Sequence, residues 1–163
     1  MRPEPDISTD RRFLLRAVAL ARANIVANSG GPFGAIVVQD SQIVAEGTNQ
    51  VVARSDPTAH AEIVAIREAT RLRQSPHLES ATIYTSCEPC PMCLGAIYWA
   101  RIARVVFALS RQDAARMGFA DDHIYRDINL PHDRRTVEFQ HVDLPEAAAI
   151  LADWMNFPDR RIY

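Results

Sequence analysis

The chain has 163 residues, a hydrophobic content of 48% and a formal net charge of −2 at pH 7. This length and apolar content suffice for one hydrophobic core without disulfide support, so we expect a single domain over residues 1–163. The cationic residues are all arginine and occur in ones and twos, which argues against the basic stripe of a nucleic-acid-binding surface. The N-terminal residues lack the apolar region of a signal peptide and no stretch has the length of a membrane span, so we expect a soluble cytoplasmic protein.

The first part of the chain predicts a helix followed by a β-hairpin. Helical spacing of apolar residues indicates a helix over residues 6–28, which Gly30-Gly31 end. Its expected buried face consists of Leu14, Val18, Ala21 and Ile25. Two β-branched runs, residues 33–39 and 42–48, are separated by Asp40-Ser41 and are typical of a hairpin.

The middle of the chain predicts alternating helices and strands. Helices are expected over residues 58–73 and 91–100, and strands over residues 81–86 and 103–109. The second strand is apolar throughout, which predicts burial on both faces. The alternation implies a parallel pair of strands in the core.

The C-terminal part is less regular. Residues 111–135 have weak periodicity and predict a short helix followed by a long loop, a kind of segment that is usually functional or disordered. Residues 136–142 predict a last strand, and residues 145–157 predict a last amphipathic helix.

The residues suited to metal chemistry open two of the predicted helices. His60, Cys90 and Cys93 together provide one imidazole and two thiolates, which with one open position is a ligand set of catalytic zinc. Pro91 favours the first helical position, so Cys90 becomes the N-cap and Cys93 the third helical residue. Both sulfurs then lie at the positive end of a helix, which favours thiolate over thiol.

Glu62 is the candidate for proton transfer. It follows His60 by two positions, where helical side chains diverge, so the two residues are not expected to bind one ion. We expect Glu62 to contact the zinc-bound water instead, to take a proton from it and to return protons to the ring nitrogen and the leaving amine. Zinc makes hydroxide available there by lowering the pKa of the water toward neutrality.

The cysteines alone leave the ligand set open. Three cysteines within seven residues argue against a disulfide framework and for metal or redox chemistry. Cys87 and Cys90 also form a C-x-x-C pair, a spacing common to redox dithiols and structural zinc half-sites. His60 with all three cysteines could complete a four-ligand structural site, but such a non-catalytic zinc module leaves Glu62 without a role.

The pattern H-x-E followed by P-C-x-x-C is typical of zinc-dependent nucleobase deaminases. With residues 31–35, 56–62 and 85–100 it resembles the small bacterial guanine deaminases of the cytidine and deoxycytidylate deaminase zinc-binding family. The resemblance runs from about Gly30 to Tyr163. It implies an α/β fold, the three-layer α/β/α cytidine deaminase architecture, with a central five-stranded mixed sheet flanked by helices.

The resemblance also implies the chemistry. It selects His60, Cys90 and Cys93 as the ligands of one zinc ion per chain, and it implies hydrolysis of guanine to xanthine and ammonia with Glu62 as proton shuttle. By position, Asn49 would hydrogen-bond the purine edge.

Two aromatic residues, Phe33 and Trp99, would pack around the ring by the same resemblance. Each proposed binding residue also has a plain structural interpretation. Phe33 and Trp99 could be core residues, and Asn49 could be a turn residue after a strand.

The same resemblance assigns roles near the C-terminus. A second acid from the long loop assists proton transfer in the family, and Asp121 aligns with it, although Asp122 follows directly. The terminal aromatic residue, here Tyr163, would close the active site of its own or of the neighbouring subunit. The simpler alternative for Tyr163 is a frayed end.

Several functions remain open from the sequence. The nearest alternative is a tRNA adenosine deaminase, which shares the motifs but must bind RNA phosphates, and an acidic chain with dispersed arginines is poorly suited to that. Guanosine and aminotriazines present the same amidine edge as guanine. The family resemblance further implies a homodimer, with the C-terminal segment exchanged between subunits in one possible arrangement.

Overall fold

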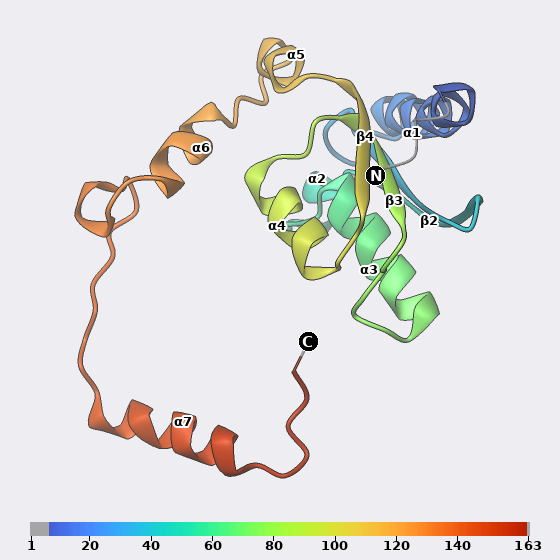
Figure 1. Ribbon diagram of the computed structural model, residues 1–163. Helices are drawn as coiled ribbons and strands as arrows, with labels where there is room; N and C mark the ends of the chain where they lie inside the picture. The colour runs from blue at the N-terminus through green and yellow to red at the C-terminus, as the bar shows by residue number, and fades with distance from the viewer. Residues whose placement is uncertain (1–6, 163) are drawn as a thin grey trace. The chain divides into compact units, whose positions relative to one another are not determined.

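The computed structural model describes residues 7–162, and the chain divides into two compact units between Asp122 and His123. The first unit is a sheet with helices on both faces (Figure 1). Its elements are, in chain order, α1 (Ile7–Ala27), β1 (Gly34–Gln39), β2 (Gln42–Thr48), α2 (Val51–Arg54), α3 (Ala61–Arg73), β3 (Thr82–Cys87), α4 (Pro91–Trp99), β4 (Arg104–Leu109) and α5 (Arg111–Arg116). Within the described range, no helix is long and apolar enough to cross a membrane. One domain over the whole chain stays a prediction.

The sheet of the first unit has four strands in the order β2-β1-β3-β4. β1 is antiparallel to both of its neighbours, whereas β3 and β4 are parallel, as the alternation of helices and strands predicted. The hairpin turn has positive φ angles at Asp40 (52°) and Ser41 (60°), which is the type I′ geometry whose twist matches that of paired strands. The predicted hairpin and the mixed sheet are therefore confirmed.

Side chains of β1 alternate between two apolar layers. Ile36 and Val38 pack with Phe13 of α1 on one face of the sheet. Ala35 and Val37 belong to the larger core on the other face, to which α3 and α4 contribute. Figure 1 shows α1 on one side of the sheet and α3 with α4 on the other. The predicted three-layer α/β/α arrangement is confirmed.

The buried face of α1 differs from the predicted face. Its buried residues are Phe13, Ala17, Ala21 and Asn24. Ile25 is exposed, and Leu14 and Val18 are only partly buried. Both sets have helical spacing, but the alanines allow a closer approach to the sheet: a Cβ on Gly34 would lie 2.7 Å from the backbone nitrogen of Ala21. Close packing therefore selects the face with small residues.

Two strand predictions are wrong. β4, predicted to be buried on both faces, is an edge strand whose Phe107 and Leu109 are 45% and 42% exposed. Residues 136–142, predicted as a strand, form none, so the described sheet has four strands and not five. A strand needs a neighbour for its backbone N–H and C=O groups, and alternating hydrophobicity does not provide one.

The second unit begins within α6 (Asp122–Ile128) and continues through η1 (His132–Arg134) and α7 (Pro145–Asn156). α7 agrees with the predicted amphipathic helix. The segment predicted as one short helix and a long loop contains α5, α6 and η1 instead. No described residue after Asp122 is buried, so this unit has no core of its own.

Candidate active site

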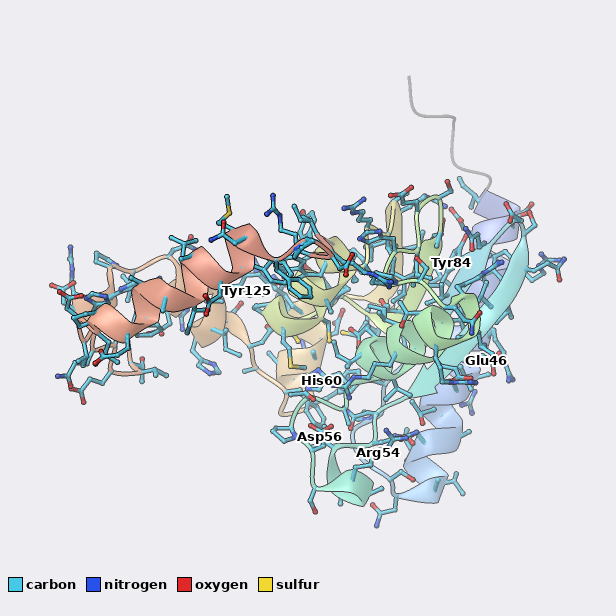
Figure 2. All side chains as sticks on the ribbon, turned by 90° about the horizontal axis from the view of Figure 1, so that it is seen from below. Glu46, Arg54, Asp56, His60, Tyr84 and Tyr125 are labelled. Carbon is cyan, nitrogen blue, oxygen red and sulfur yellow. The ribbon has the colours of Figure 1, made fainter. Side chains whose placement is uncertain are left out.

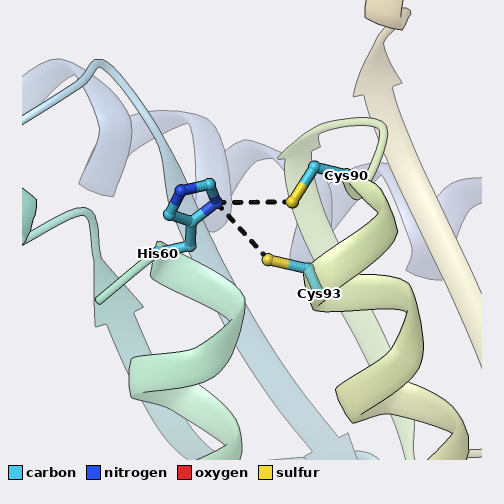
Figure 3. Close-up of side chains that lie close together, drawn as sticks. All are labelled: His60, Cys90 and Cys93. Atoms are coloured by element: carbon cyan, nitrogen blue, oxygen red, sulfur yellow. Dashed lines mark hydrogen bonds between the residues drawn. The ribbon is translucent and has the colours of Figure 1, made fainter. Parts of the chain in front are cut away.

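Two helix N-termini carry the three predicted metal ligands. His60 is the N-cap of α3 and Cys90 the N-cap of α4, with Pro91 at the helix start and Cys93 in the first turn, as predicted. The Nδ1 atom of His60 lies 3.5 Å from each sulfur (Figure 3). All three ligand atoms lie within 4.8 Å of one another. Neither N-cap side chain accepts a capping hydrogen bond, so both are available to a metal ion.

The ligand separations fit a tetrahedral zinc site. Zinc–nitrogen and zinc–sulfur bonds of roughly 2.0 and 2.3 Å that meet at the tetrahedral angle place nitrogen and sulfur about 3.6 Å apart. The observed 3.5 Å agrees with this value. No fourth histidine, cysteine or carboxylate in residues 7–162 joins the group. Three protein ligands leave a fourth position for water or substrate, which distinguishes a catalytic from a structural zinc site.

The two thiols hold their protons unequally. A hydrogen bond from Cys93 lowers the pKa of Cys90 to about 4, and His60 contributes to the shift. The same hydrogen bond, together with burial, raises the pKa of Cys93. The pair therefore retains one proton at neutral pH, and metal binding displaces it because only thiolates are strong zinc ligands.

The turn ahead of α3 is organised by Asp56, which Figure 2 labels close to His60. One carboxylate oxygen of Asp56 accepts hydrogen bonds from the backbone N–H (2.8 Å) and the hydroxyl (2.7 Å) of Thr58. The backbone N–H of Gln50 donates to the carbonyl of Ala59 (2.9 Å). This Asx turn directs the chain into α3, and the bond from Gln50 holds the end of β2 beside the metal ligand His60.

Glu62 lies in the first turn of α3, where its side chain is buried. Burial raises the pKa of its carboxyl to about 7, and the carboxyl interacts electrostatically with Cys90, Cys93 and His60. A pKa near neutrality suits a group that accepts and returns protons, while a cation bound by these ligands would lower it again. The structure thus brings Glu62 to the ligand cluster.

Cys87 lies outside the ligand cluster. Its thiol donates a hydrogen bond to the carbonyl of Ser110 (3.4 Å), and burial raises its pKa to about 11. A protonated thiol directed at a carbonyl is not a metal ligand. The alternative of a four-ligand structural site is therefore not supported.

Asn49 and Phe33 are adjacent where β2 ends and β1 begins. The Asn49 backbone N–H donates to the Phe33 carbonyl (3.1 Å). The Oδ1 atom of Asn49 accepts hydrogen bonds from the backbone N–H groups of Gly31 (3.1 Å) and Val51 (3.2 Å). A carbonyl oxygen has two lone pairs, so this amide can offer a ligand only the donors of Nδ2. The Phe33 ring packs edge-to-face on Phe119, with centroids 5.0 Å apart.

Asp121, of the two candidate second acids, is the one coupled to the metal ligands. Burial raises the pKa of Asp121, and the charge on Cys90 raises it further. Asp122 instead lies 3.8 Å from the guanidinium of Arg111 and begins α6. These surroundings favour Asp121 as the acid that faces the cluster.

The other two aromatic candidates are not placed at the cluster. Trp99 is the last residue of α4 and is 69% exposed. Six residues separate it from Cys93, which corresponds to roughly 9 Å along a helix axis. Tyr163 lies outside the described residues. Contacts of Trp99 and Tyr163 with a substrate stay predictions.

Sequence analysis missed two residues near Asn49. One is Phe119, and the other is Asn24, whose Nδ2 donates to the carbonyls of Gly31 (2.8 Å) and Asn49 (2.9 Å). The signal for Asn24 was its place on the alanine-lined face of α1, because a polar side chain on a buried face needs hydrogen-bond partners. Nothing in the periodicity of the loop indicated Phe119.

Residues 7–109 match the model of the cytidine and deoxycytidylate deaminase zinc-binding region, and the match includes the three ligands and Glu62. The chain belongs to this zinc-binding deaminase family. The resemblance predicted from the motifs, the fold and the His60, Cys90 and Cys93 zinc site are thereby confirmed.

Several relatives within the family cover most of the chain. Guanine deaminase from Bacillus subtilis is 49% identical over 151 residues, 93% of this chain and 97% of the relative. A crystal structure of guanine deaminase from the same organism has a TM-score of 0.92 at 48% identity, covering 94% of this chain and 98% of that chain. A tRNA-specific adenosine deaminase from Buchnera aphidicola is 37% identical over 129 residues, 79% of this chain and 83% of the relative.

Proposed function

We propose that this chain is a zinc-dependent guanine deaminase, which hydrolyses guanine to xanthine and ammonia. The proposal is carried by the 49% identity with Bacillus subtilis guanine deaminase over 93% of this chain, combined with a preorganised three-ligand zinc site. A structure of guanine deaminase from Nitrosomonas europaea adds support, with a TM-score of 0.64 and 34% identity over 67% of this chain and 63% of that chain.

The chemistry divides between the metal site and Glu62. Zinc, held by His60, Cys90 and Cys93, supplies a Lewis acid that lowers the pKa of a coordinated water toward neutrality. Glu62 accepts the proton of the attacking water and donates it to the ring nitrogen beside the amino-bearing carbon. It then moves the proton of the new hydroxyl to the amino group, which leaves as ammonia while the carbonyl of xanthine forms.

The remaining site residues bind the ring and assist the departure of ammonia. Asn49 offers its Nδ2 donors to an acceptor on the purine edge, and Phe33 packs against the ring. Asp121, the acid coupled to Cys90, assists proton transfer to the leaving amine. Trp99 and Tyr163 complete the enclosure and exclude water.

We further propose a homodimer in which the C-terminal segment is exchanged. The second unit has no buried residue, yet α7 exposes large apolar side chains such as Ile150 and Trp154. β4 is an edge strand with an exposed Phe107, and such edges need a partner. Thiolate ligands and free cysteines fit a reducing compartment, so we place the dimer in the cytoplasm.

A second candidate is tRNA adenosine deamination, because relatives with that name share this family. The net charge of −2 argues against it, since affinity for RNA comes largely from contacts between cations and phosphates. Guanosine and aminotriazines remain alternative small substrates.

The test is ammonia release from zinc-loaded protein with guanine, guanosine, adenine, cytosine, cytidine and ammeline, alongside a gel shift with tRNA. We expect guanine to give the highest kcat/KM and tRNA to give no shift. Turnover restricted to tRNA adenosine would replace the proposal with the second candidate. Zinc binding without turnover of any substrate would indicate a non-catalytic module.

A further inference from the structure

Asn24 of α1 is a buried polar residue that takes no part in the chemistry described above. Its side chain is 3% exposed. The Nδ2 group uses its two hydrogens on two different segments, the Gly31 carbonyl (2.8 Å) and the Asn49 carbonyl (2.9 Å). One amide of α1 therefore joins the loop that follows this helix to the end of β2.

The segments joined by Asn24 also hold the Asn49 side chain. Gly31 receives a hydrogen bond from Asn24 at its carbonyl and donates one from its N–H to Oδ1 of Asn49. The Val51 N–H donates to the same oxygen. A Cβ on Gly30 would overlap Oδ1, so the loop encloses this atom closely. Rotating the Asn49 amide by 180° would direct its NH₂ group at two N–H donors, which is unfavourable.

We propose that Asn24 is a positioning residue for substrate recognition, which acts by fixing the Asn49 amide with its Nδ2 donors toward the ring. The site then selects a heterocycle that presents a hydrogen-bond acceptor, a ring nitrogen or a carbonyl oxygen, at the edge facing Asn49. A ring with C–H or N–H at that position is rejected because the Asn49 donors would lose their partner. This inference rests on the proposed function, which assigns Asn49 to the purine edge.

The test compares guanine with 3-deazaguanine and 7-deazaguanine, in each of which C–H replaces one ring-nitrogen acceptor. In wild-type protein, we expect one analogue to have a markedly lower kcat/KM than guanine. In Asn24→Ala, we expect kcat/KM for guanine to fall about tenfold or more, chiefly through KM, as for loss of buried hydrogen bonds. The preference for guanine over that analogue should shrink toward one, because the lost contact is the one that distinguished them.

Three further variants separate positioning from stability. Asn24→Ser retains one donor and should fall between wild type and Asn24→Ala, which also covers the case of an alanine variant that folds poorly. Asn28→Ala strains the end of the same helix, where Asn28 has a φ of 51°, so it should lower stability and leave KM unchanged. In an Asn49→Ala background, Asn24→Ala should change KM little further, because both residues act through one contact.

The outcomes distinguish this inference from the proposed function. If wild type does not deaminate guanine, the proposed function fails, and the same comparison is made on whichever panel compound is turned over. If wild type deaminates guanine but Asn24→Ala lowers only thermal stability, or slows guanine and both deaza analogues equally, the positioning role is overturned. Zinc content per chain should equal that of wild type in every Asn24 variant.

Discussion

At the scale of single residues, the site consists of polar groups that the local backbone leaves free. His60 and Cys90 occupy N-cap positions, where serine or aspartate would bond the helix, but their side chains accept no capping hydrogen bond. Asn49 commits its oxygen to two backbone N–H groups and keeps its nitrogen free. Metal binding and ring recognition therefore depend on which atoms the fold has not already used.

Glu62→Gln should retain zinc and fold but lose nearly all turnover. The amide has almost the same shape as the carboxyl but cannot accept and return a proton. General acid–base groups typically account for about a hundred- to ten-thousandfold in rate, and one group with both duties should lie near the upper limit. The measurement is kcat for ammonia release together with zinc content per chain. Activity within tenfold of wild type would rule out this mechanism.

Asp121→Asn and Asp122→Asn form a matched pair of neighbouring variants. Asp121 is coupled to Cys90, whereas Asp122 is near Arg111, so only the first change should lower kcat substantially. Zinc content should be unchanged in both. A larger loss of kcat in Asp122→Asn would show that the loop assignment is off by one residue.

Cys90→Ala and Cys87→Ala should differ in metal content. Cys90 lies 3.5 Å from Nδ1 of His60, while the Cys87 thiol is bonded to the Ser110 carbonyl. Loss of one of three protein ligands should abolish stoichiometric zinc binding, and loss of Cys87 should leave one zinc ion per chain. Elemental analysis of the purified variants measures this, and the reverse pattern would mean that Cys87 is a ligand.

At the scale of secondary-structure elements, the position of α3 on the sheet sets the position of the metal ligand and the proton shuttle. His60 and Glu62 both lie at the start of this helix. α3 approaches the sheet at Gly47 of β2, where a Cβ would overlap the Ala61 carbonyl and lie 2.6 Å from the backbone nitrogen of Ala65. The absence of a side chain at Gly47 therefore controls the geometry of the site.

Gly47→Ala should lower both stability and zinc affinity. The added methyl group must displace backbone atoms of α3, and overpacking of this kind typically costs about 1–3 kcal/mol. Gly95→Ala in α4 is the matched control, because a Cβ there meets nothing within 4 Å. It should stabilise the protein by about 0.5–1 kcal/mol through helix propensity. Denaturant unfolding and zinc titration measure both variants, and equal behaviour of the two would contradict the packing argument.

At the scale of the whole molecule, the two units differ in their capacity to stand alone. The first unit has buried layers on both faces of its sheet. The second unit has no buried residue, although its sequence contains the apolar face of α7. A segment of this kind gains stability only by packing against another surface, which is the physical basis of the proposed exchanged dimer.

The exchanged dimer predicts complementation between two defective chains. Removal of residues 160–163 should lower turnover by roughly tenfold with little change in zinc content, as for loss of a closing segment. Refolding this truncated chain together with full-length Glu62→Gln should restore about a quarter of wild-type activity, because half of randomly formed dimers are mixed and each has one complete site. Light scattering should show a dimer. No recovery in a confirmed mixed dimer would mean that the tail acts on its own subunit.

Much of the fold and of the metal site was predictable from the sequence, because local rules determine both. The Asp40-Ser41 turn, the helix start at Pro91 and the ligand spacing around Cys90 all depend on residues close together in the chain. The motif around His60 and Glu62 likewise identified the family and the zinc chemistry before any coordinates were considered.

Tertiary structure decided the features that depend on distant segments. The sheet selected the alanine-lined face of α1 over the larger apolar face, because Gly34 allows close packing there. The same contact buried Asn24, whose partners lie on a loop and on another strand. Residues 136–142 have a strand pattern but no strand, because pairing needs a second backbone that a local sequence cannot specify.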